Sequence, residues 1–398
     1  EDEVREFASQ LQGEHALNRT EGESELPAEV DLQGPGELYE QFGSAVEEEL
    51  VAELPEHPEF MRFREEWFLQ DLLVPIEEGH LNIAEALIEI KAMPLPSAEF
   101  LPDLDLPVEA PAEIQALSLN FALEEDERFD NIGDGGRDIW YLRRLTPEMV
   151  VDPPIRLQIE QVAFDRADVA DELLLIEREI DDEGSGEDVM GPSRPLYKTT
   201  IALTYPHWRC GTLPLTVRTR GLFPQSANHH TPIVLIDGQS GNKMQGWVVH
   251  EELFVYGLAD WYERYNLPVG AIIRLERTRD PRVVTVDYEP RRVKRQWVKV
   301  AVLEAQALAF ELQKLPISCE YDEQLTVGED SPAASDRLWT EVHDREESLL
   351  QTMVRVMPAL VEHRPQNPVH AKTIYSAVNI LRRVSPGPIF GLLSKEAC

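Results

Sequence analysis

Cysteine is scarce in this chain, with 3 among 398 residues. Cys210, Cys319 and Cys398 lie far apart and are odd in number, which argues against a disulfide-stapled scaffold. Free thiols are typical of a reducing compartment, because disulfides persist mainly in oxidising ones. The cysteine pattern therefore predicts a cytoplasmic protein.

Long apolar runs are missing as well. No run reaches the roughly 18 residues that a membrane helix needs. The first ten residues are acidic and polar, whereas a signal peptide is basic and then apolar. We therefore expect no membrane partner. The 42 % of hydrophobic residues is enough to fill ordinary cores, which excludes wholesale disorder.

Motifs for cofactors and metals are also lacking. His207 and Cys210 have no second ligand pair at the spacing of a structural zinc site. The Gly-containing segment 237–246 lacks the Gly-Lys-Ser/Thr ending of a phosphate loop, and it is typical of a hairpin turn. We therefore predict no cofactor, no metal and no catalytic residue.

The nearest approach to a catalytic set lies in the central block. Asp287 and Glu289 are two apart, so they would share one face of a strand. Pro290 then ends that strand, and Lys294 lies beyond the break. Metal-assisted cleavage needs convergent carboxylates and a group that positions water. A nuclease centred on this block is therefore kept only as an alternative.

Positive charge is confined to one part of the chain. The formal net charge is −37, but residues 1–190 hold 51 acidic against 12 basic residues, a net −39. Residues 191–300 carry +7 and residues 301–398 carry −5. Such an uneven distribution of charge is informative about the binding partners of a protein rather than about its fold. It favours nucleic acid or an acidic protein as partner of the central block.

Residues 80–145 have the pattern of three helices and a hairpin. Apolar residues at positions 83, 87 and 90 lie on one helix face. A short helix fits 97–104, and Pro111 suits the first turn of a third helix. β-prone runs flank a Gly-rich turn at 133–136, which predicts a hairpin.

This segment resembles the HARE-type winged helix, the family that includes the N-terminal domain of the bacterial RNA polymerase delta subunit. The resemblance rests on Pro-Leu-Pro-Ser-Ala-Glu-Phe-Leu at 94–101 and on the wing ending Arg-Asp-Ile-Trp-Tyr-Leu at 137–142. Residues 345–398 resemble a second copy, cut off before its wing, with Asn-Pro-Val-His-Ala-Lys-Thr-Ile at 367–374. The resemblance implies a DNA-binding or polymerase-associated module.

Residues 196–312 form the basic block, which we expect to be β-barrel-like because short β-prone runs alternate with turns. Strands are expected at 199–204, 213–219, 233–236, 246–249, 271–275 and 283–288, and helices at 251–265 and 301–313. The block is similar in outline to a DNA-binding pseudobarrel of the plant transcription-factor and restriction-effector kind. That similarity rests on Gly246-Trp247 and on the run from Asn266 to Ile273.

The candidate nucleic-acid contacts fall into three groups. The run 291–299 holds five basic residues around one Trp; Lys and Arg neutralise phosphates, and an exposed Trp stacks on bases. In the alternative interpretation, this run is a basic edge strand whose charge is neutralised by the acidic N-terminal half of the same chain. The wing and the C-terminal helices supply further cations. The candidates are Arg291, Arg292, Lys294, Arg295, Trp297 and Lys299, then Arg137, Arg143 and Arg144, then Lys372, Arg382 and Arg383.

We therefore predict an α+β multi-domain protein with a winged helix, a central β-barrel-like domain and a second, truncated winged helix. The boundaries are an acidic disordered and helical segment 1–79, a winged helix 80–150, an acidic linker with a helix 151–195, the basic domain 196–312, a linker 313–344 and the truncated winged helix 345–398. Within them, helices are expected over 38–73 and 159–180. Two more are expected near the end of the chain, where apolar residues recur at helical spacing at 349, 353 and 357 and again at 374, 378 and 381. The expected function is a non-enzymatic adaptor associated with nucleic acid, more specifically DNA, with RNA polymerase or with another protein. An acidic interaction scaffold or nucleic-acid mimic is the alternative, since the third helix of the first module is acidic rather than basic.

Overall fold

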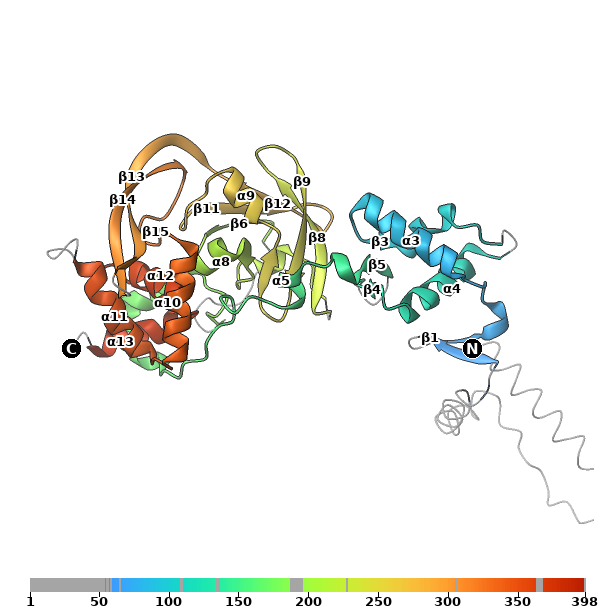
Figure 1. Ribbon diagram of the computed structural model, residues 1–398, viewed down its shortest axis with the longest axis horizontal. Coiled ribbons are helices and arrows are strands. Elements are labelled where there is room, and N and C mark those ends of the chain that lie inside the picture. The colour runs from blue at the N-terminus through green and yellow to red at the C-terminus, as the bar shows by residue number, and fades with distance from the viewer. Residues whose placement is uncertain are drawn as a thin grey trace, which may run out of the picture. The chain divides into compact units, whose positions relative to one another are not determined.

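The computed structural model describes residues 54, 57, 59–63, 66–107, 110–133, 137–186, 196–226, 228–304, 307–362 and 368–396 (Figure 1). The chain is mixed α and β, as the sequence predicts. It divides into two compact units. The first comprises Glu1–Ile76 with Leu106–Phe121, and the second comprises Glu77–Asp105 with Ala122–Cys398.

The described part of the first unit holds a short hairpin and most of one helix. Its elements are β1 (Phe60–Phe63), β2 (Glu66–Leu69), η2 (Gln70–Leu72) and α4 (Ala112–Glu125), of which the residues after Phe121 belong to the second unit. The two strands pair antiparallel. The rings of Phe63 and Phe121 meet edge to face, with centres 6.3 Å apart. The helical pattern predicted over 38–73 is therefore wrong at 60–63 and 66–69, where aromatic residues suit strands.

The second unit begins with elements expected of the first module. They are α3 (Glu78–Lys91), β3 (Leu95–Pro96), η3 (Ser97–Glu99), η4 (Leu101–Asp103), β4 (Phe129–Asn131) and β5 (Ile139–Leu142). The strands form an antiparallel sheet in the order β3-β5-β4. The predicted first helix and hairpin are confirmed, and two 3-10 turns replace the short helix. Trp140 on β5 is buried, with 1 % of its surface exposed.

A curled sheet of seven strands forms the centre of the second unit (Figure 1). Its strands are β6 (Lys198–Ala202), β7 (Thr212–Pro214), β8 (His230–Asp237), β9 (Lys243–Val249), β10 (Phe254–Tyr256), β11 (Ile272–Arg277) and β12 (Val283–Tyr288). They are ordered β6-β11-β12-β8-β9-β10-β7, and only β12 and β8 run parallel. The strands expected here are confirmed in outline. The helix expected over 251–265 is reduced to α9 (Ala259–Arg264), because β10 occupies its first part.

Short elements connect these sheets. They are η5 (Arg143–Leu145), α5 (Glu148–Val151), η6 (Arg166–Asp168), α6 (Asp171–Ile180), α8 (Tyr205–Cys210) and η7 (Arg220–Leu222). The helix predicted over 159–180 is confined to α6. Asp165 explains part of the difference, since its side chain accepts a hydrogen bond from the Ala167 N–H and turns the chain there.

A long hairpin corrects the sequence prediction for 301–344. β13 (Pro290–Glu304) pairs with β14 (Ala307–Cys319) and, in parallel, with β15 (Val327–Glu329); the helix α10 (Pro332–Asp344) follows. The predicted helix at 301–313 and linker at 313–344 are therefore wrong. Val300 on β13 packs in the core of the curled sheet, whereas Ala301 packs in the helical core. A strand buried on both faces reads as one continuous apolar run, which resembles a buried helix.

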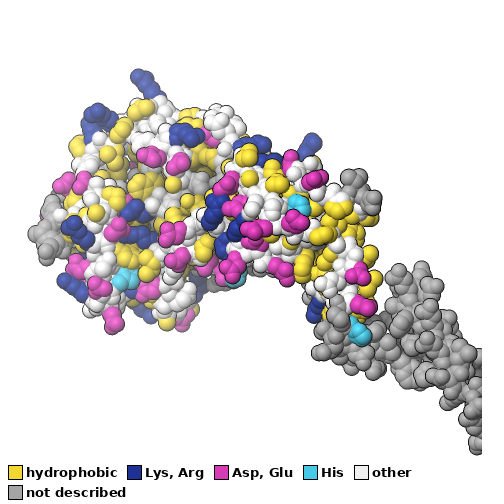
Figure 2. All heavy atoms as spheres, turned by 45° about the vertical axis from the view of Figure 1, so that its right-hand side comes forward, with side chains coloured by type: hydrophobic (Ala, Val, Ile, Leu, Met, Phe, Trp, Pro, Cys, Tyr) yellow, Lys and Arg dark blue, Asp and Glu magenta, His cyan; other side chains and the backbone are white. Residues whose placement is uncertain are grey.

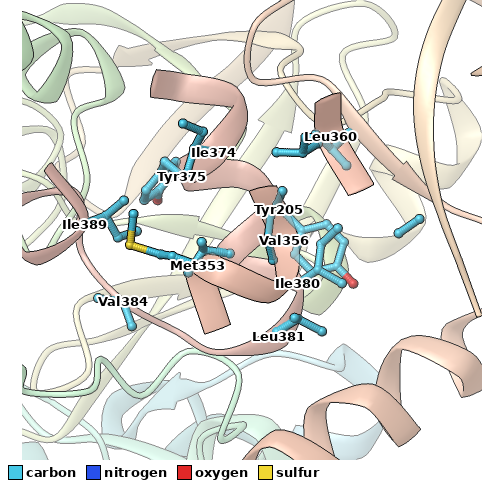
Figure 3. Close-up of a cluster of buried hydrophobic side chains, with 14 of the residues drawn as sticks. Tyr205, Met353, Val356, Leu360, Ile374, Tyr375, Ile380, Leu381, Val384 and Ile389 are labelled. Atoms are coloured by element: carbon cyan, nitrogen blue, oxygen red, sulfur yellow. The ribbon is translucent and has the colours of Figure 1, made fainter. Parts of the chain in front are cut away.

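Helices at the end of the chain surround the helical core, the cluster of buried side chains that includes Ala301, Met353 and Tyr375. They are α11 (Leu349–Val361), α12 (Ala371–Leu381) and α13 (Pro386–Glu396), close to the predicted positions. Figure 3 shows Met353 and Val356 of α11 near Ile374 and Tyr375 of α12 within this core. Every residue of α12 is buried, so this helix forms the centre of the bundle.

Candidate nucleic-acid interface

The first half of β13 projects the basic run to the surface of the second unit. Residues 291–295 are all exposed, whereas Val298 and Val300 further along the strand are buried. The hairpin is the long orange one at the upper left of Figure 1. Figure 2 shows Lys and Arg side chains standing out along the upper edge of the molecule. The predicted run therefore forms a continuous exposed segment.

Three cations of this run lack a carboxylate partner. Arg291 is paired, since its guanidinium lies 2.7 Å from Glu320. Arg292, Lys294 and Arg295 make no ion pair or side-chain hydrogen bond with any residue that the structure describes. Their charge is therefore available to an external anion such as a phosphate.

Trp297 lies at the end of the exposed segment. Its side chain is 60 % exposed, whereas each of the other six Trp residues is buried or partly buried. Lys314 lies directly opposite on β14, and its ammonium stands 5.2 Å from the centre of the Trp297 ring. A cation at that distance is attracted by the face of the ring. An exposed indole beside cations is a stacking platform for a base.

A small pocket of about 230 Å³ opens beside Trp297. Lys299 and Gln296 of β13 contribute to its lining, and Tyr321 and Gln324 face them from the segment that leads into β15. β13 pairs with β15 only from Lys299 to Ala301, so the strand edge before Lys299 is open toward this pocket. The pocket is therefore continuous with the basic segment.

The wing arginines are held by acids of the same module. Arg143 lies 2.8 Å from Asp130 on β4. Arg144 binds both Glu85 and Glu89 of α3, at 2.8 and 2.5 Å. These pairs are largely exposed and carry modest energy, because water screens them. Arg137 is exposed and lies just before β5. The wing thus presents far less uncompensated charge than β13.

The three C-terminal candidates are buried rather than exposed. Lys372 lies 2.7 Å from Asp322 and 2.8 Å from Glu179. The Arg382 guanidinium binds both carboxylate oxygens of Glu160. Carboxylates of the same chain thus neutralise the charges of Lys372 and Arg382. A direct phosphate contact would have to break these pairs, so the structure separates these residues from the exposed group on β13.

Arg383 is the centre of a buried ion-pair network. Its Nη2 donates to Glu183 Oε1 at 2.5 Å, and its guanidinium lies 3.0 Å from Asp182. His207 Nε2 lies 3.0 Å from the same Glu183 oxygen. Burial raises the pKa of Glu183, but the charges of Arg383 and His207 outweigh it, so this pKa lies well below its ordinary value. Only 2 % of Arg383 is exposed.

The acids of this network were expected to be solvated. Residues 181–188 have the composition of a linker, yet Asp181, Asp182 and Glu183 are buried. Asp182 also accepts a hydrogen bond from Tyr375 of α12 at 2.5 Å. No local pattern signals this, because Arg383 and Tyr375, which bind Asp182, lie about 200 positions away in the sequence. The prediction of a solvated linker is therefore wrong at these residues.

Asp181 differs from its two neighbours. Thr216 donates a hydrogen bond to its Oδ2 at 2.9 Å, while its buried Oδ1 has no hydrogen-bond partner. Burial is the main reason why its pKa is raised to about 6. Asp181 is the left-handed C-cap of α6, with a φ of 55°, a conformation that Asp adopts more readily than most residues. Arg218 approaches its Oδ1 only to 4.0 Å, so the buried carboxyl is weakly compensated.

The carboxylates considered for a nuclease are already engaged. Arg274 lies 2.8 Å from Glu289 and 3.6 Å from Asp287, so a cation sits between the two acids. Gln239 also donates to Asp287 at 2.5 Å. Among the residues that the structure describes, no group of three His, Cys, Asp or Glu side chains is placed to hold a metal ion.

The chain matches no family model, no curated protein and no solved structure in the comparisons made. None of the described helices combines the length and the apolar character needed to cross a membrane.

Proposed function

We propose that this chain is a non-enzymatic nucleic-acid-binding adaptor whose contact surface is the exposed part of β13. The observation that carries the proposal is the juxtaposition of Arg292, Lys294 and Arg295 with the exposed Trp297. Cations bind phosphates and release counterions, while an exposed indole stacks on any base. Together they provide affinity without requiring a particular base sequence.

The charge environment supports this choice of surface. In a chain of net charge −37, acidic residues are abundant enough to pair with most cations. Arg143, Arg144 and Arg383 are paired in this way. Three neighbouring cations of β13 have no ion-pair partner in the described part of the chain, and they fit a function that needs positive charge directed outward.

The remaining modules suit protein partners. α3 and the β3-β5-β4 sheet fit a winged helix of the HARE type, and α11 to α13 fit the truncated second copy. Because α4 is acidic, we propose that the first module contacts a protein, with RNA polymerase as the leading candidate, rather than a DNA groove. The two described cysteines, Cys210 and Cys319, are free and buried, which suits the cytoplasm as its location.

A salt titration of binding tests the proposal. Fluorescence anisotropy of the full chain with labelled single-stranded DNA, duplex DNA and RNA would be measured between 50 mM and 300 mM salt. We expect binding that weakens steadily as salt rises, because counterions compete for the phosphates. Absence of binding to all three at 50 mM, or affinity that does not change with salt, would count against the proposal.

A further inference from the structure

The pocket beside Trp297 has the size and chemistry of a site for one nucleobase. Its volume of about 230 Å³ is smaller than the roughly 300–1,000 Å³ of pockets that hold drug-sized ligands. Trp297 and Tyr321 supply aromatic surface at its wall. A planar base can stack on such surface, whereas a base inside a duplex has both faces covered.

Some polar side chains of the pocket already have hydrogen-bond partners in the fold, and others have none among the described residues. The hydroxyl of Thr326 donates to the Asp322 carbonyl, and that of Thr373 donates to the Gln324 carbonyl, each at 2.7 Å. The side-chain amide of Gln296 has no hydrogen-bond partner among the described residues. The side-chain nitrogen of Gln324 has none among them either. A glutamine amide offers a donor and an acceptor, which is the pattern that pairs with a base edge.

The pocket also lies at the correct spacing from the cations. Arg295 and Trp297 are two residues apart on β13, so their side chains leave the same side of the strand about 7 Å apart. A nucleotide whose phosphate contacts Arg295 can therefore place its base at Trp297. Lys294, one residue before Arg295, leaves the opposite side of the strand, so Arg295 is the cation that shares the side of Trp297.

We infer that the pocket takes one unstacked base of a single-stranded nucleic acid, with Trp297 as stacking platform and the side-chain amide of Gln324 contacting the base edge. The inference rests on the proposed function and names its substrate class. Duplex nucleic acid can bind the same cations through its backbone, but its paired bases cannot enter the pocket.

Oligonucleotides with and without bases separate the two contributions. The full chain would be titrated with a labelled single-stranded oligonucleotide, with an abasic oligonucleotide of equal length and charge, and with the duplex. We expect the intact single strand to bind about 10- to 100-fold more tightly than the abasic strand, as loss of one stacked base implies. Equal affinity for intact and abasic strands, or tighter binding of the duplex, overturns the inference while the proposed phosphate surface stands. If no oligonucleotide binds, the proposed function itself fails.

Variants locate the effect in the pocket. Trp297→Ala should lose about 10-fold or more in affinity for the intact strand and little for the abasic one, while Trp297→Phe should retain most of it. Gln324→Ala tests the edge contact without removing aromatic surface. Val354→Ala, at an exposed apolar position on α11 outside the proposed surface, is the matched control and should bind like the wild type. If Trp297→Ala and Gln324→Ala both bind the intact strand as tightly as this control, the base pocket is overturned.

Discussion

Trp297 and Lys314 face each other across the β13–β14 hairpin, and the Lys314 ammonium stands 5.2 Å from the centre of the indole. The contact keeps an exposed aromatic ring beside a positive charge in the middle of a strand whose first half carries three cations without an ion pair among the described residues. Stacking and phosphate binding are thus combined on one element.

The first prediction concerns the unpaired cations. Arg292→Glu, Lys294→Glu and Arg295→Glu together should abolish nucleic-acid binding or weaken it more than tenfold. If residual binding is measurable, the slope of log affinity against log salt should flatten by about 2 for a single strand, which is about 0.7 for each lost phosphate contact.

The matched control for this variant reverses three exposed cations elsewhere. Lys243→Glu, Arg279→Glu and Arg337→Glu change the net charge by the same amount but leave β13 intact. Anisotropy titrations of the two variants decide between a local contact and a general charge effect. Equal losses in both would mean that β13 is not the contact surface.

The second prediction concerns the acidic N-terminal segment. Residues 1–50 hold 15 acidic and 2 basic residues and should compete with nucleic acid for the basic surface. Replacing this segment by a Gly/Ser sequence of equal length should raise the affinity at 50 mM salt. The gain should shrink at high salt, because the Debye length falls from about 10 Å at 0.1 M to about 3 Å at 1 M. Unchanged affinity at low salt would exclude self-competition.

The third prediction concerns the buried ion pairs of Arg383. Arg383→Met should lower the free energy of unfolding by about 3–5 kcal/mol, because it leaves the carboxylates of Asp182 and Glu183 buried without their cation. Adding Asp182→Asn and Glu183→Gln should recover part of that loss, since the buried charges are then gone. Urea unfolding measures both effects, with Arg337→Met as exposed control. A triple variant less stable than Arg383→Met alone would contradict this account.

The fourth prediction concerns pH and Asp181. Its pKa is raised from 3.8 to about 6 by burial, so the folded protein holds this proton more tightly than the unfolded chain. The stability contributed by protonated Asp181 is complete below about pH 4 and is lost as pH rises through 6. Asp181→Asn removes the buried charge. Relative to the wild type, the variant should therefore gain about 3 kcal/mol between pH 4 and pH 8.

Urea unfolding at several pH values checks the fourth prediction through the difference between wild type and Asp181→Asn. The substitution Asp103→Asn, made at an exposed position, serves as control and should show no such trend. If the difference between wild type and Asp181→Asn stays constant over this pH range, the carboxyl of Asp181 titrates normally in the fold.

The fifth prediction concerns chemistry. We expect no cleavage of single- or double-stranded DNA or RNA with Mg²⁺, Mn²⁺ or Zn²⁺, because Arg274 occupies the position between Asp287 and Glu289 that a metal ion would need. Gel assays with labelled substrates measure this. Metal-dependent cleavage that disappears in the Asp287→Ala, Glu289→Ala variant would establish a nuclease instead.

Local sequence patterns determined most helices and strands of the second unit. Apolar residues at helical spacing marked α3, α11 and α12, and β-prone runs between turn residues marked the strands of the curled sheet. The cluster of Arg and Lys around Trp297 was visible as well. These features could be predicted because each follows from residues that are close in the chain.

Tertiary structure alone decided how those elements are buried. Val300 and Ala301 are adjacent on β13 but belong to different cores, so the sequence shows no alternation that would mark a strand. Asp182 and Arg383 look like surface residues in their local sequences, yet they neutralise each other in the interior. The same basic residue type is free at Arg295 and buried at Arg383, because a carboxylate about 200 residues away reaches only the second. Pairing between distant segments is what fixes the energy of a charge, and no local pattern contains it.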